Sequence, residues 1–420
     1  MKILFLAPYA PFPPRGGGQQ RMYHMLRLLG ARHDVHLLTM APEQAADAGD
    51  TVALDPLRAY CQITTVPVPP HRVSRRLQAF VSSSLPDMVL RGAHPAFAAA
   101  LARLLARHDF DVVQLESIEM APYGRGGSRH VQGSHRALWS YDAFNVEYLL
   151  QRRACLTVLR RPRTWPVAFY SWVQWQKLRR FERRLATHAD LILAVSDGDR
   201  HELQRLTDSR LPVVVVPNGV DTSYFDPNAL DELNPDTLPA VPYILFTGTL
   251  DFRPNVDAVQ WFVRSVWSRI RAKRPDLRFL VVGQRPTASM QALRAVPGVE
   301  IVGAVEDIRP WFARAGCYIL PMRIGGGVRL KLLETWAMGL PCVTTTLGSE
   351  GVAGFIPGIH ALVADDAEGL AAAVELALDD QATARRLAEA GRQLVLEHYD
   401  WQPIVAGMEQ VYEQFRSERR

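Results

Sequence analysis

The feature that most constrains the fold is a repeated alternation of short apolar runs with helical segments. Residues 3–7 form a continuous apolar run, which is typical of a strand buried on both faces of a parallel sheet. A loop rich in proline and glycine, with Gly16, Gly17 and Gly18, follows this run, and apolar residues then recur at helical spacing over 22–29. This order predicts a βαβ unit at the start of the chain.

The alternation continues along the chain and restarts once. Further strands are predicted around the β-branched and apolar runs at 35–38, 112–113, 190–195, 213–216, 243–248, 280–283, 301–303 and 318–321, and a helix is predicted over 256–270. The turn signal Pro217-Asn218-Gly219 opens a stretch in which Pro and Asp cluster. The pattern therefore predicts an α/β fold with two doubly wound halves.

The expected domain boundaries follow from this pattern. They are a first domain over 1–216, a linker over 217–240, a second domain over 241–395 and a C-terminal helix within 396–420. The last helix is indicated by apolar residues at helical spacing between Trp401 and Phe415. Such a helix must cover an apolar surface.

Composition sets limits on the class of protein. The 420 residues, 48% hydrophobic and 22% charged, fit a globular chain of two to three domains, and the net charge of +5 argues only weakly for a polyanionic partner. The four cysteines form no C-x-x-C pair, which argues against a disulfide framework or a zinc site. The N-terminal apolar run is too short for a signal peptide. We therefore expect a cytoplasmic protein.

The most informative stretch is a glycine triplet between a strand and a helix. Gly325, Gly326 and Gly327 follow a strand that ends near Pro321, and a helix is predicted to begin near Val328. Glycines let the backbone approach a ligand without interference from Cβ atoms, and a helix N-terminus favours phosphate. Gly339, followed by a proline two residues later, marks the end of this helix.

Charged residues in the same helix strengthen the phosphate interpretation. Arg329 and Lys331 place positive charge in the first turn, where cations are unfavourable unless an anion is bound. Glu334 is expected about two turns into the helix, where a carboxylate could accept hydrogen bonds from a ribose diol. The alternative is a purely structural loop.

At this point the sequence resembles a known family. The motifs that carry the resemblance are Pro217-Asn218-Gly219-Val220-Asp221 with Phe225, Gly248 followed by Pro254-Asn255, Val281-Val282-Gly283, Gly303 before Asp307, and Glu334-x-x-Ala337-x-Gly339-x-Pro341-x-Val343. They occur in the order found in the retaining GT-B glycosyltransferases of family 4. The resemblance implies two Rossmann-like domains facing across a cleft, with the last helix crossing back to the first domain.

The resemblance also implies roles for single residues. Glu334 matches the second glutamate of the family's paired-glutamate motif, whereas Gly326 stands where the first should be. Thr249 and Pro254 occupy the family's Arg and Lys positions, and Arg253, Arg329 and Lys331 are the expected substitutes that neutralise the diphosphate. The remaining expected donor contacts are Gly16, Gly17, Gly18, Gly248, Ala304, Val305, Gly325, Gly326, Gly327 and Val328.

The implied activity is transfer of a sugar from a nucleotide diphosphate donor to a saccharide or lipid-linked acceptor, in surface polysaccharide assembly, with no metal or other cofactor. Phe144 replaces the histidine that relatives carry near the sugar, in the segment from Asp142 to Glu147. An alternative is a nucleotide-sugar-binding or scaffold protein without catalytic activity. An epimerase of the same fold would be expected to carry more acidic and basic residues in its cleft.

Two other patterns each allow more than one interpretation. Asp197-Gly198-Asp199 reads as Asp-x-Asp, a metal-binding signature of another glycosyltransferase fold, but the pattern lies at a predicted helix start, where acidic residues favour the macrodipole, and capping explains it. Residues 151–184 carry ten Arg and Lys residues interleaved with aromatic residues, and Glu182 is their only acidic neighbour. This segment suits an anionic membrane surface, or else its aromatic residues pack inward while its arginines are solvated. No nucleic-acid-binding motif accompanies the charge.

Overall fold

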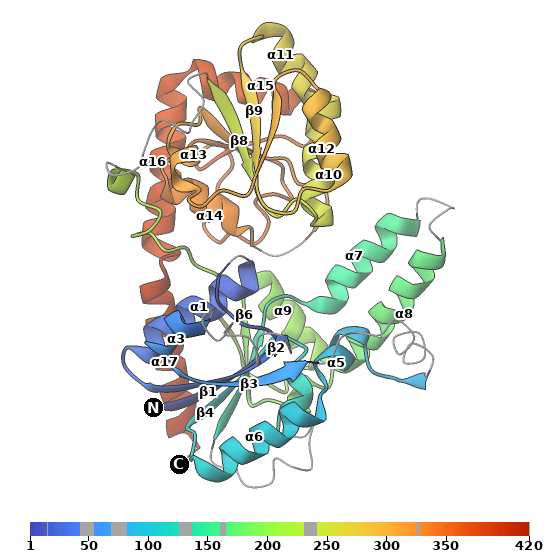
Figure 1. Ribbon diagram of the computed structural model, residues 1–420, viewed down its shortest axis with the longest axis vertical. Helices are drawn as coiled ribbons and strands as arrows, with labels where there is room; N and C mark the ends of the chain where they lie inside the picture. Colours follow the sequence, from blue (N-terminus) through green and yellow to red (C-terminus); the bar gives the residue numbers. More distant parts are fainter. Residues whose placement is uncertain are drawn as a thin grey trace. The chain divides into compact units, whose positions relative to one another are not determined.

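The computed structural model describes residues 1–14, 16–42, 54–68, 82–125, 137–159, 165–230, 242–325 and 328–419. The chain divides into two compact units, and each is considered by itself (Figure 1). Unit 1 contains residues 1–217 and 402–420, and unit 2 contains residues 218–401. Ten residues of the stretch expected as a linker, 231–240, lie outside the described ranges, as does residue 241.

Unit 1 is built on a parallel sheet with the strand order β3-β2-β1-β4-β5-β6-β7 in the described residues. Its strands are β1 (Lys2–Ala7), β2 (Asp34–Pro42), β3 (Gln62–Val68), β4 (Val112–Glu116), β5 (Leu138–Ala143), β6 (Leu191–Ala194) and β7 (Val213–Val215). Its helices are α1 (Gly17–Gly30), α3 (Asp55–Arg58), α5 (Asp87–Gly92), α6 (Pro95–Arg107), α7 (Glu147–Leu159), α8 (Trp165–Glu182) and α9 (Asp197–Leu206). Figure 1 shows α1 and α6 on opposite sides of this sheet, as a doubly wound fold requires.

Unit 2 is a second parallel sheet, with the strand order β10-β9-β8-β11-β12-β13 in the described residues. Its strands are β8 (Tyr243–Thr247), β9 (Arg278–Val282), β10 (Val299–Gly303), β11 (Cys317–Leu320), β12 (Cys342–Thr344) and β13 (Leu362–Val363). Its helices are α10 (Arg253–Phe262), α11 (Ser268–Lys273), α12 (Ala288–Gln291), α13 (Arg309–Ala313), α14 (Leu330–Ala337), α15 (Ala367–Asp379) and α16 (Gln381–His398). A π-helical segment, Val263–Trp267, joins α10 to α11.

The central strands explain why continuous apolar runs predicted them. Residues 3–7 of β1 are fully buried, and every residue of β8 and β11 is buried, because helices cover both faces of each sheet. The expected α/β class with two Rossmann-like doubly wound domains is therefore confirmed. Strands β3, β5, β12 and β13 were not predicted.

The last helix, α17 (Trp401–Ser417), returns to the first unit, as expected for the C-terminal helix. Glu409 of α17 accepts a contact of 2.6 Å from His33 Nε2 and one of 2.8 Å from Arg32. Tyr412 is fully buried, and its hydroxyl donates to the side chain of Gln114 on β4. The chain therefore ends by covering the domain with which it began.

Candidate functional site

The candidate donor site lies at the carboxyl edge of the unit 2 sheet. Strands β8 and β11 are neighbours there, and the strand order runs outward in opposite directions from this pair. Parallel α/β sheets bind ligands at such a topological switch point, in the loops that follow the two strands. The loop after β8 carries Gly248, and the loop after β11 carries the glycine triplet.

Gly248 is required by its close contacts. Its φ is +150°, and a Cβ atom there would lie 2.1 Å from the Lys331 ammonium nitrogen. A Cβ on Gly283, at the end of β9, would lie 1.7 Å from the Gly248 carbonyl oxygen. The family-like glycines after β8 and β9 therefore allow three chain segments to meet at one point.

Lys331 is held in this position by α10 and by the strand beneath it. Its Nζ donates to Asn255 Oδ1 at 2.9 Å and lies 5.0 Å from the centre of the Phe246 ring. The Asn255 side chain is buried, and its Nδ2 donates to the Thr249 carbonyl oxygen at 2.9 Å. Burial lowers the pKa of Lys331 to about 7, with Arg329 acting in the same direction and Glu334 opposing it.

The loop after β11 is longer than the sequence indicated. The helix α14 begins at Leu330 rather than near Val328, because Arg329 is still extended, with φ −88° and ψ 99°, and acts as the N-cap. Gly325 has φ +127°, and a Cβ there would lie 2.5 Å from the Arg329 guanidinium. The Arg329 side chain therefore lies directly against the first glycine of the triplet. Gly326 and Gly327 lie outside the described residues.

The later start of α14 also changes the position of Glu334 within the helix. It lies a little more than one turn into α14, not two turns as expected, and close enough to Lys331 to favour its charged form. The helix ends as the sequence predicted: Gly339 has φ +64°, its N–H donates to Trp336 O at 2.9 Å, and Leu340 N–H donates to Thr335 O at 3.1 Å. These two bonds form a Schellman motif.

The other donor residues expected in unit 2 lie in the loops at the same sheet edge. Arg253 is the exposed first residue of α10, in the loop region after β8. Ala304 and Val305 follow β10 after Gly303, whose φ is +96°; Ala304 is exposed and Val305 packs partly on the core. Val328 is half-buried in the loop before α14. Their roles stay predictions.

The glycines of the unit 1 loop lie at the start of α1. Gly16 is its N-cap, Gly17 is exposed, and a Cβ on Gly18 would lie 2.5 Å from the Tyr9 hydroxyl and 2.8 Å from the Phe144 ring. Phe144, which stands at the family's histidine position, therefore packs against the glycine loop. The contact of these glycines with a donor stays a prediction.

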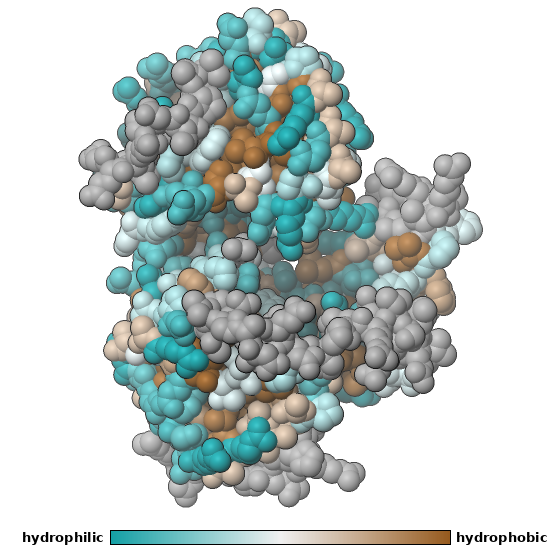
Figure 2. Space-filling model, in the orientation of Figure 1, coloured by the Kyte–Doolittle hydropathy of each residue, from teal (hydrophilic) through white to brown (hydrophobic). Residues whose placement is uncertain are grey.

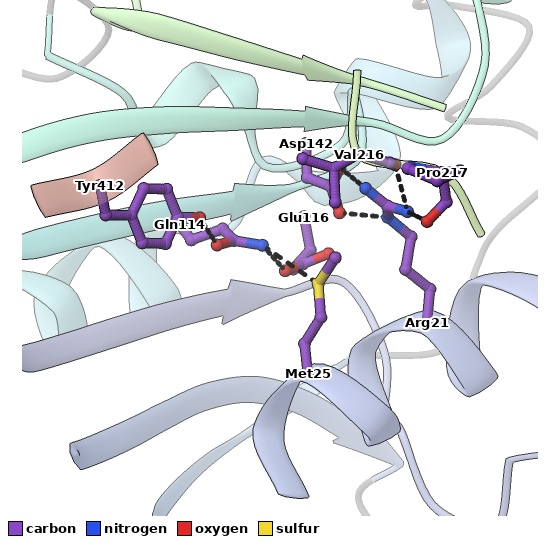
Figure 3. A network of polar contacts seen from close by, with 8 residues as sticks. All are labelled: Arg21, Met25, Gln114, Glu116, Asp142, Val216, Pro217 and Tyr412. Carbon is purple, nitrogen blue, oxygen red and sulfur yellow. Dashed lines mark hydrogen bonds and ion pairs between the residues drawn. The ribbon is translucent and has the colours of Figure 1, made fainter. Parts of the chain in front are cut away.

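A buried polar network in unit 1 was missed by the sequence reasoning (Figure 3). Arg21 of α1 donates to both carboxylate oxygens of Asp142 at 2.7 Å, and also to the Val216 and Pro217 carbonyl oxygens at 2.9 and 3.1 Å. Arg21 and Asp142 are 1% and 0% exposed, so this is a fully buried ion pair. The match of Asp142 to the family segment was the signal that could have indicated it.

A second buried carboxyl lies beside this pair. Glu116, at the end of β4, accepts a hydrogen bond of 2.6 Å from Gln114 Nε2. Burial and the neighbouring Asp142 raise the pKa of Glu116, while Arg21 opposes this. Gln114 in turn accepts from Tyr412, so the network connects β4 and β5 with α1 and α17 (Figure 3).

Further acidic residues with raised pKa values surround the start of α7. Glu182 is fully buried and accepts the backbone N–H groups of Glu147 and Tyr148 at 2.9 Å, so it caps α7 from α8. Burial, with added repulsion from Glu147, raises the pKa of Glu182 to about 8, and burial with repulsion from Glu119 raises that of Glu147 to about 7. Burial therefore shifts both carboxyl groups towards their protonated form.

The Asp-x-Asp pattern has a local explanation. Ser196 caps α9, its Oγ accepting the Asp199 N–H at 3.1 Å and donating to the Asp199 carboxylate at 2.7 Å. Asp197 forms an ion pair of 2.8 Å with Arg200. Within the described ranges, no group of three or more His, Cys, Asp or Glu side chains is arranged to hold a metal ion.

Known proteins resemble this chain over its whole length in structure and over part of it in sequence. Glycogen synthase of Mycobacterium tuberculosis is 30% identical over 242 residues, which are 55% of this chain and 56% of that protein. The chain spans about half the length of these curated relatives. Sucrose-phosphate synthase of Thermosynechococcus elongatus superposes with a TM-score of 0.72 at 19% identity, covering 100% of both chains.

A second solved structure carries a donor. HepE of Anabaena, crystallised in complex with UDP-glucose, superposes with a TM-score of 0.66 at 14% identity, covering 99% of this chain and 100% of that one. At these identities the two structures establish the fold, which is GT-B.

Two family models match in succession. The model described as Glycosyl transferases group 1 matches residues 241–380, and the model described as Glycosyltransferase Family 4 matches residues 15–224, which are half of the chain. The two-sheet architecture and the glycine-lined switch point agree with these matches. The chain belongs to glycosyltransferase family 4.

Proposed function

We propose that this protein is a retaining glycosyltransferase that moves a sugar from a nucleotide diphosphate sugar to a saccharide or lipid-linked acceptor, in surface polysaccharide assembly. The observation that carries the proposal is the position of Lys331, whose ammonium lies against Gly248 and Asn255 at the switch point of unit 2. HepE, which has the same fold, binds UDP-glucose, and this supports a nucleotide sugar as the donor.

The diphosphate would be bound by the cations that replace the family's usual pair. Arg329 and Lys331 come from the start of α14, and Arg253 is the first residue of α10. A cation that is held in place before the substrate binds stabilises the charge that develops on a leaving phosphate without reorganisation. Lys331 fits this role because its Nζ is already fixed by Asn255.

The other donor contacts are proposed around the same point. Glu334 would accept hydrogen bonds from the ribose hydroxyls, the backbone of Gly325 to Val328 would take the place of the missing first glutamate, and Ala304 with Val305 would form a wall for the base. Gly325 suits this role because it has no Cβ and can therefore adopt the positive φ that brings the backbone close to a ligand. No metal is assigned a role.

The transfer step needs no protein nucleophile. The bond between the anomeric carbon and the donor phosphate oxygen breaks, the acceptor oxygen bonds to that carbon on the same face, and the departing phosphate oxygen takes the acceptor's proton. The protein's part is to bind and orient the diphosphate and to stabilise its charge. This matches the presence of Phe144 where relatives carry a histidine.

A second candidate is a nucleotide-sugar-binding protein without turnover. It is favoured by Phe144, which packs on Gly18 and offers no proton-transferring group. The two candidates differ in one observable, because only an enzyme releases nucleoside diphosphate from the donor in the presence of an acceptor.

The test begins with a thermal-shift panel of nucleotide sugars. A ligand at 100 times its dissociation constant should stabilise the fold by about 2.7 kcal/mol. With the best donor, release of nucleoside diphosphate is then measured for the wild type and for Lys331→Met. We expect turnover in the wild type and a loss of orders of magnitude in the variant, and NMR of the product should give a retained anomeric configuration.

A matched control uses another lysine of unit 2. Lys273 is 69% exposed and pairs with Glu375 at 2.8 Å, so Lys273→Met should leave the rate unchanged. Donor binding without release in the wild type would favour the binding protein. An unchanged rate in Lys331→Met would refute the assigned role of this lysine.

The proposed location is cytoplasmic, with peripheral contact at the inner face of the membrane. Of the helices in the described ranges, none combines the length and apolar character of a bilayer-spanning segment. The four cysteines are free and buried, which suits a reducing compartment. Contact with the membrane surface would bring a lipid-linked acceptor within reach, and it can be tested separately.

A further inference from the structure

The helical hairpin formed by α7 and α8 carries an unusual surface. It extends away from the unit 1 sheet in Figure 1, and Figure 2 shows hydrophobic surface, in brown, over the same hairpin. Large apolar side chains are exposed on the last turn of α7 and the first two turns of α8. They are Leu156, Leu159, Trp165, Val167, Phe169 and Trp172, which are 48 to 60% exposed.

Around Cys155 and Ala168, the hairpin has small residues inside and large apolar residues outside. The residues between the helices are small: Cys155 and Ala168 are each 1% exposed, and the Cys155 Sγ lies 3.5 Å from the Ala168 carbonyl oxygen. Ser171 is also buried. Small residues thus fill the inner face in this part of α8, whereas Trp165, Phe169 and Trp172 lie on the outer face.

The exposed aromatic residues form one stripe. Trp165, Phe169 and Trp172 are spaced i, i+4 and i+7, which places them on one face of α8. The Phe169 and Trp172 rings stack with centroids 6.2 Å apart. Single exposed apolar residues are common on soluble proteins, but a contiguous patch of them marks an interaction surface.

The exposed charges of the hairpin all have one sign in its described part. Arg152 and Arg153 of α7 are exposed, as are Arg179 and Arg180 of α8 and the following Arg183 and Arg184. The acidic Glu182 is turned inward, where it caps α7. Arg160, Arg161 and Arg163 lie outside the described residues.

The base of the hairpin is fixed to unit 1. Lys177 Nζ donates to the Ser83 carbonyl oxygen at 2.7 Å, and Gln174 Oε1 accepts the Asp87 N–H, at the start of α5, at 2.9 Å. The aromatic stripe begins at Trp165, about two to three turns before these contacts, and ends at Trp172, just before Gln174. The hairpin is therefore anchored at one end, and its apolar stripe begins at the other.

We propose that the outer face of the α7–α8 hairpin binds an anionic lipid bilayer, with Trp165, Phe169 and Trp172 in the interface and the arginines on lipid phosphates. Tryptophan is the side chain that membrane interfaces favour most clearly, and basic residues near it add attraction to anionic headgroups. Binding of a second copy through this face would bring arginines against arginines. Nucleic acid is a poorer partner, because the exposed aliphatic side chains of Leu156, Leu159 and Val167 suit lipid acyl chains better than nucleic-acid bases.

The experiment measures co-sedimentation of the full chain with vesicles. The vesicles are phosphatidylcholine alone, or phosphatidylcholine with about 30% phosphatidylglycerol to supply the negative surface potential. We expect binding to the anionic vesicles only, weakened by salt. The triple variant W165S/F169S/W172S should bind at least about tenfold less tightly, because it removes most of the apolar area that enters the interface.

The matched control is F252S, since Phe252 is 56% exposed but lies in unit 2. This variant should bind vesicles like the wild type. Circular dichroism and donor-dependent nucleotide release should be unchanged in the triple variant, because none of its three residues is assigned to the proposed donor site. Vesicle binding therefore stands or falls independently of sugar transfer.

Three outcomes would overturn the proposal. They are absence of wild-type binding to anionic vesicles, equal binding by the triple variant, and wild-type dimers in light scattering that the triple variant converts to monomers. The last result would identify a second copy as the occupant of this face.

Discussion

At the scale of single residues, we expect Lys331 to couple nucleotide binding to pH. Burial lowers the pKa of the free amine to about 7, and a bound diphosphate favours the charged form and raises it. Above pH 7 binding must therefore take up a proton. We expect the affinity for the best-binding nucleoside diphosphate to fall as pH rises above 7, by up to about tenfold per pH unit, as measured by calorimetry.

The variant Lys331→Met isolates this effect. It should bind the nucleotide about ten- to a hundredfold more weakly at pH 7, because a hydrogen bond to a charged group is lost, and its affinity should depend less on pH than that of the wild type. Lys273→Met serves as the control and should follow the wild-type profile. Equal affinities of the wild type at pH 7 and pH 9 would contradict the assignment.

Gly248 makes a separate prediction about backbone shape. In Gly248→Ala the new methyl group would meet the Lys331 amine at 2.1 Å, at a φ that side chains rarely adopt. We expect a loss of about 1–3 kcal/mol in unfolding free energy, together with weaker nucleotide binding. Both effects are expected because the added methyl group forces the Lys331 side chain out of its position.

Chemical denaturation and calorimetry measure the two effects. Gly407→Ala is the control, since nothing lies within 4 Å of the added carbon and the site is in a helix. That substitution should stabilise the protein by up to about 1 kcal/mol. An unchanged nucleotide affinity in Gly248→Ala would mean that the lysine does not depend on this contact.

At the scale of secondary-structure elements, the sequence predicted what apolar runs encode and missed what tertiary contacts decide. The runs at 3–7 and 243–247 are continuous, and the structure has them as β1 and β8. Strand β5 was missed because Ser140 and Asp142 interrupt its apolar pattern, and both are fully buried. Asp142 can be buried only because Arg21, distant in sequence, pairs with it.

The start of α14 shows the same limit within the candidate site. Gly339 predicted the end of the helix correctly. The glycine triplet predicted a start near Val328, but Arg329 is extended and the helix begins at Leu330. Sequence alone could not give this, because the Arg329 side chain lies against Gly325 only once the loop has folded. The contact of Lys331 with Asn255 likewise joins two helices that are far apart in the chain.

For the Arg21–Asp142 pair, we expect the losses of unfolding free energy in single and double variants to be strongly non-additive. Arg21→Met should cost about 3–5 kcal/mol, because it leaves a buried carboxylate without its partner. The double variant Arg21→Met/Asp142→Leu should lose less than the sum of the two single variants, since it removes both charges. Urea denaturation measures all three, and additive losses would mean that the two side chains do not act as a pair.

At the scale of the whole molecule, α17 makes the end of the chain part of the first domain. Val405, Met408 and Tyr412 are at most 1% exposed, and residues 402–420 belong to unit 1. A change in this helix should therefore act on a sheet whose strands lie about 200 or more residues earlier in the chain, whereas unit 2 keeps its own core.

Tyr412 tests this long-range dependence. Tyr412→Ala should destabilise unit 1 by about 3–5 kcal/mol through the cavity it leaves, and Tyr412→Phe by about 1–3 kcal/mol, because Gln114 loses its hydrogen-bond donor. Hydrogen exchange should then rise in β4 and β5 and stay unchanged in β8 and β11. Glu413→Ala, the next residue and exposed, should leave both sheets protected. Faster exchange in the unit 2 sheet would show that the two units do not unfold separately.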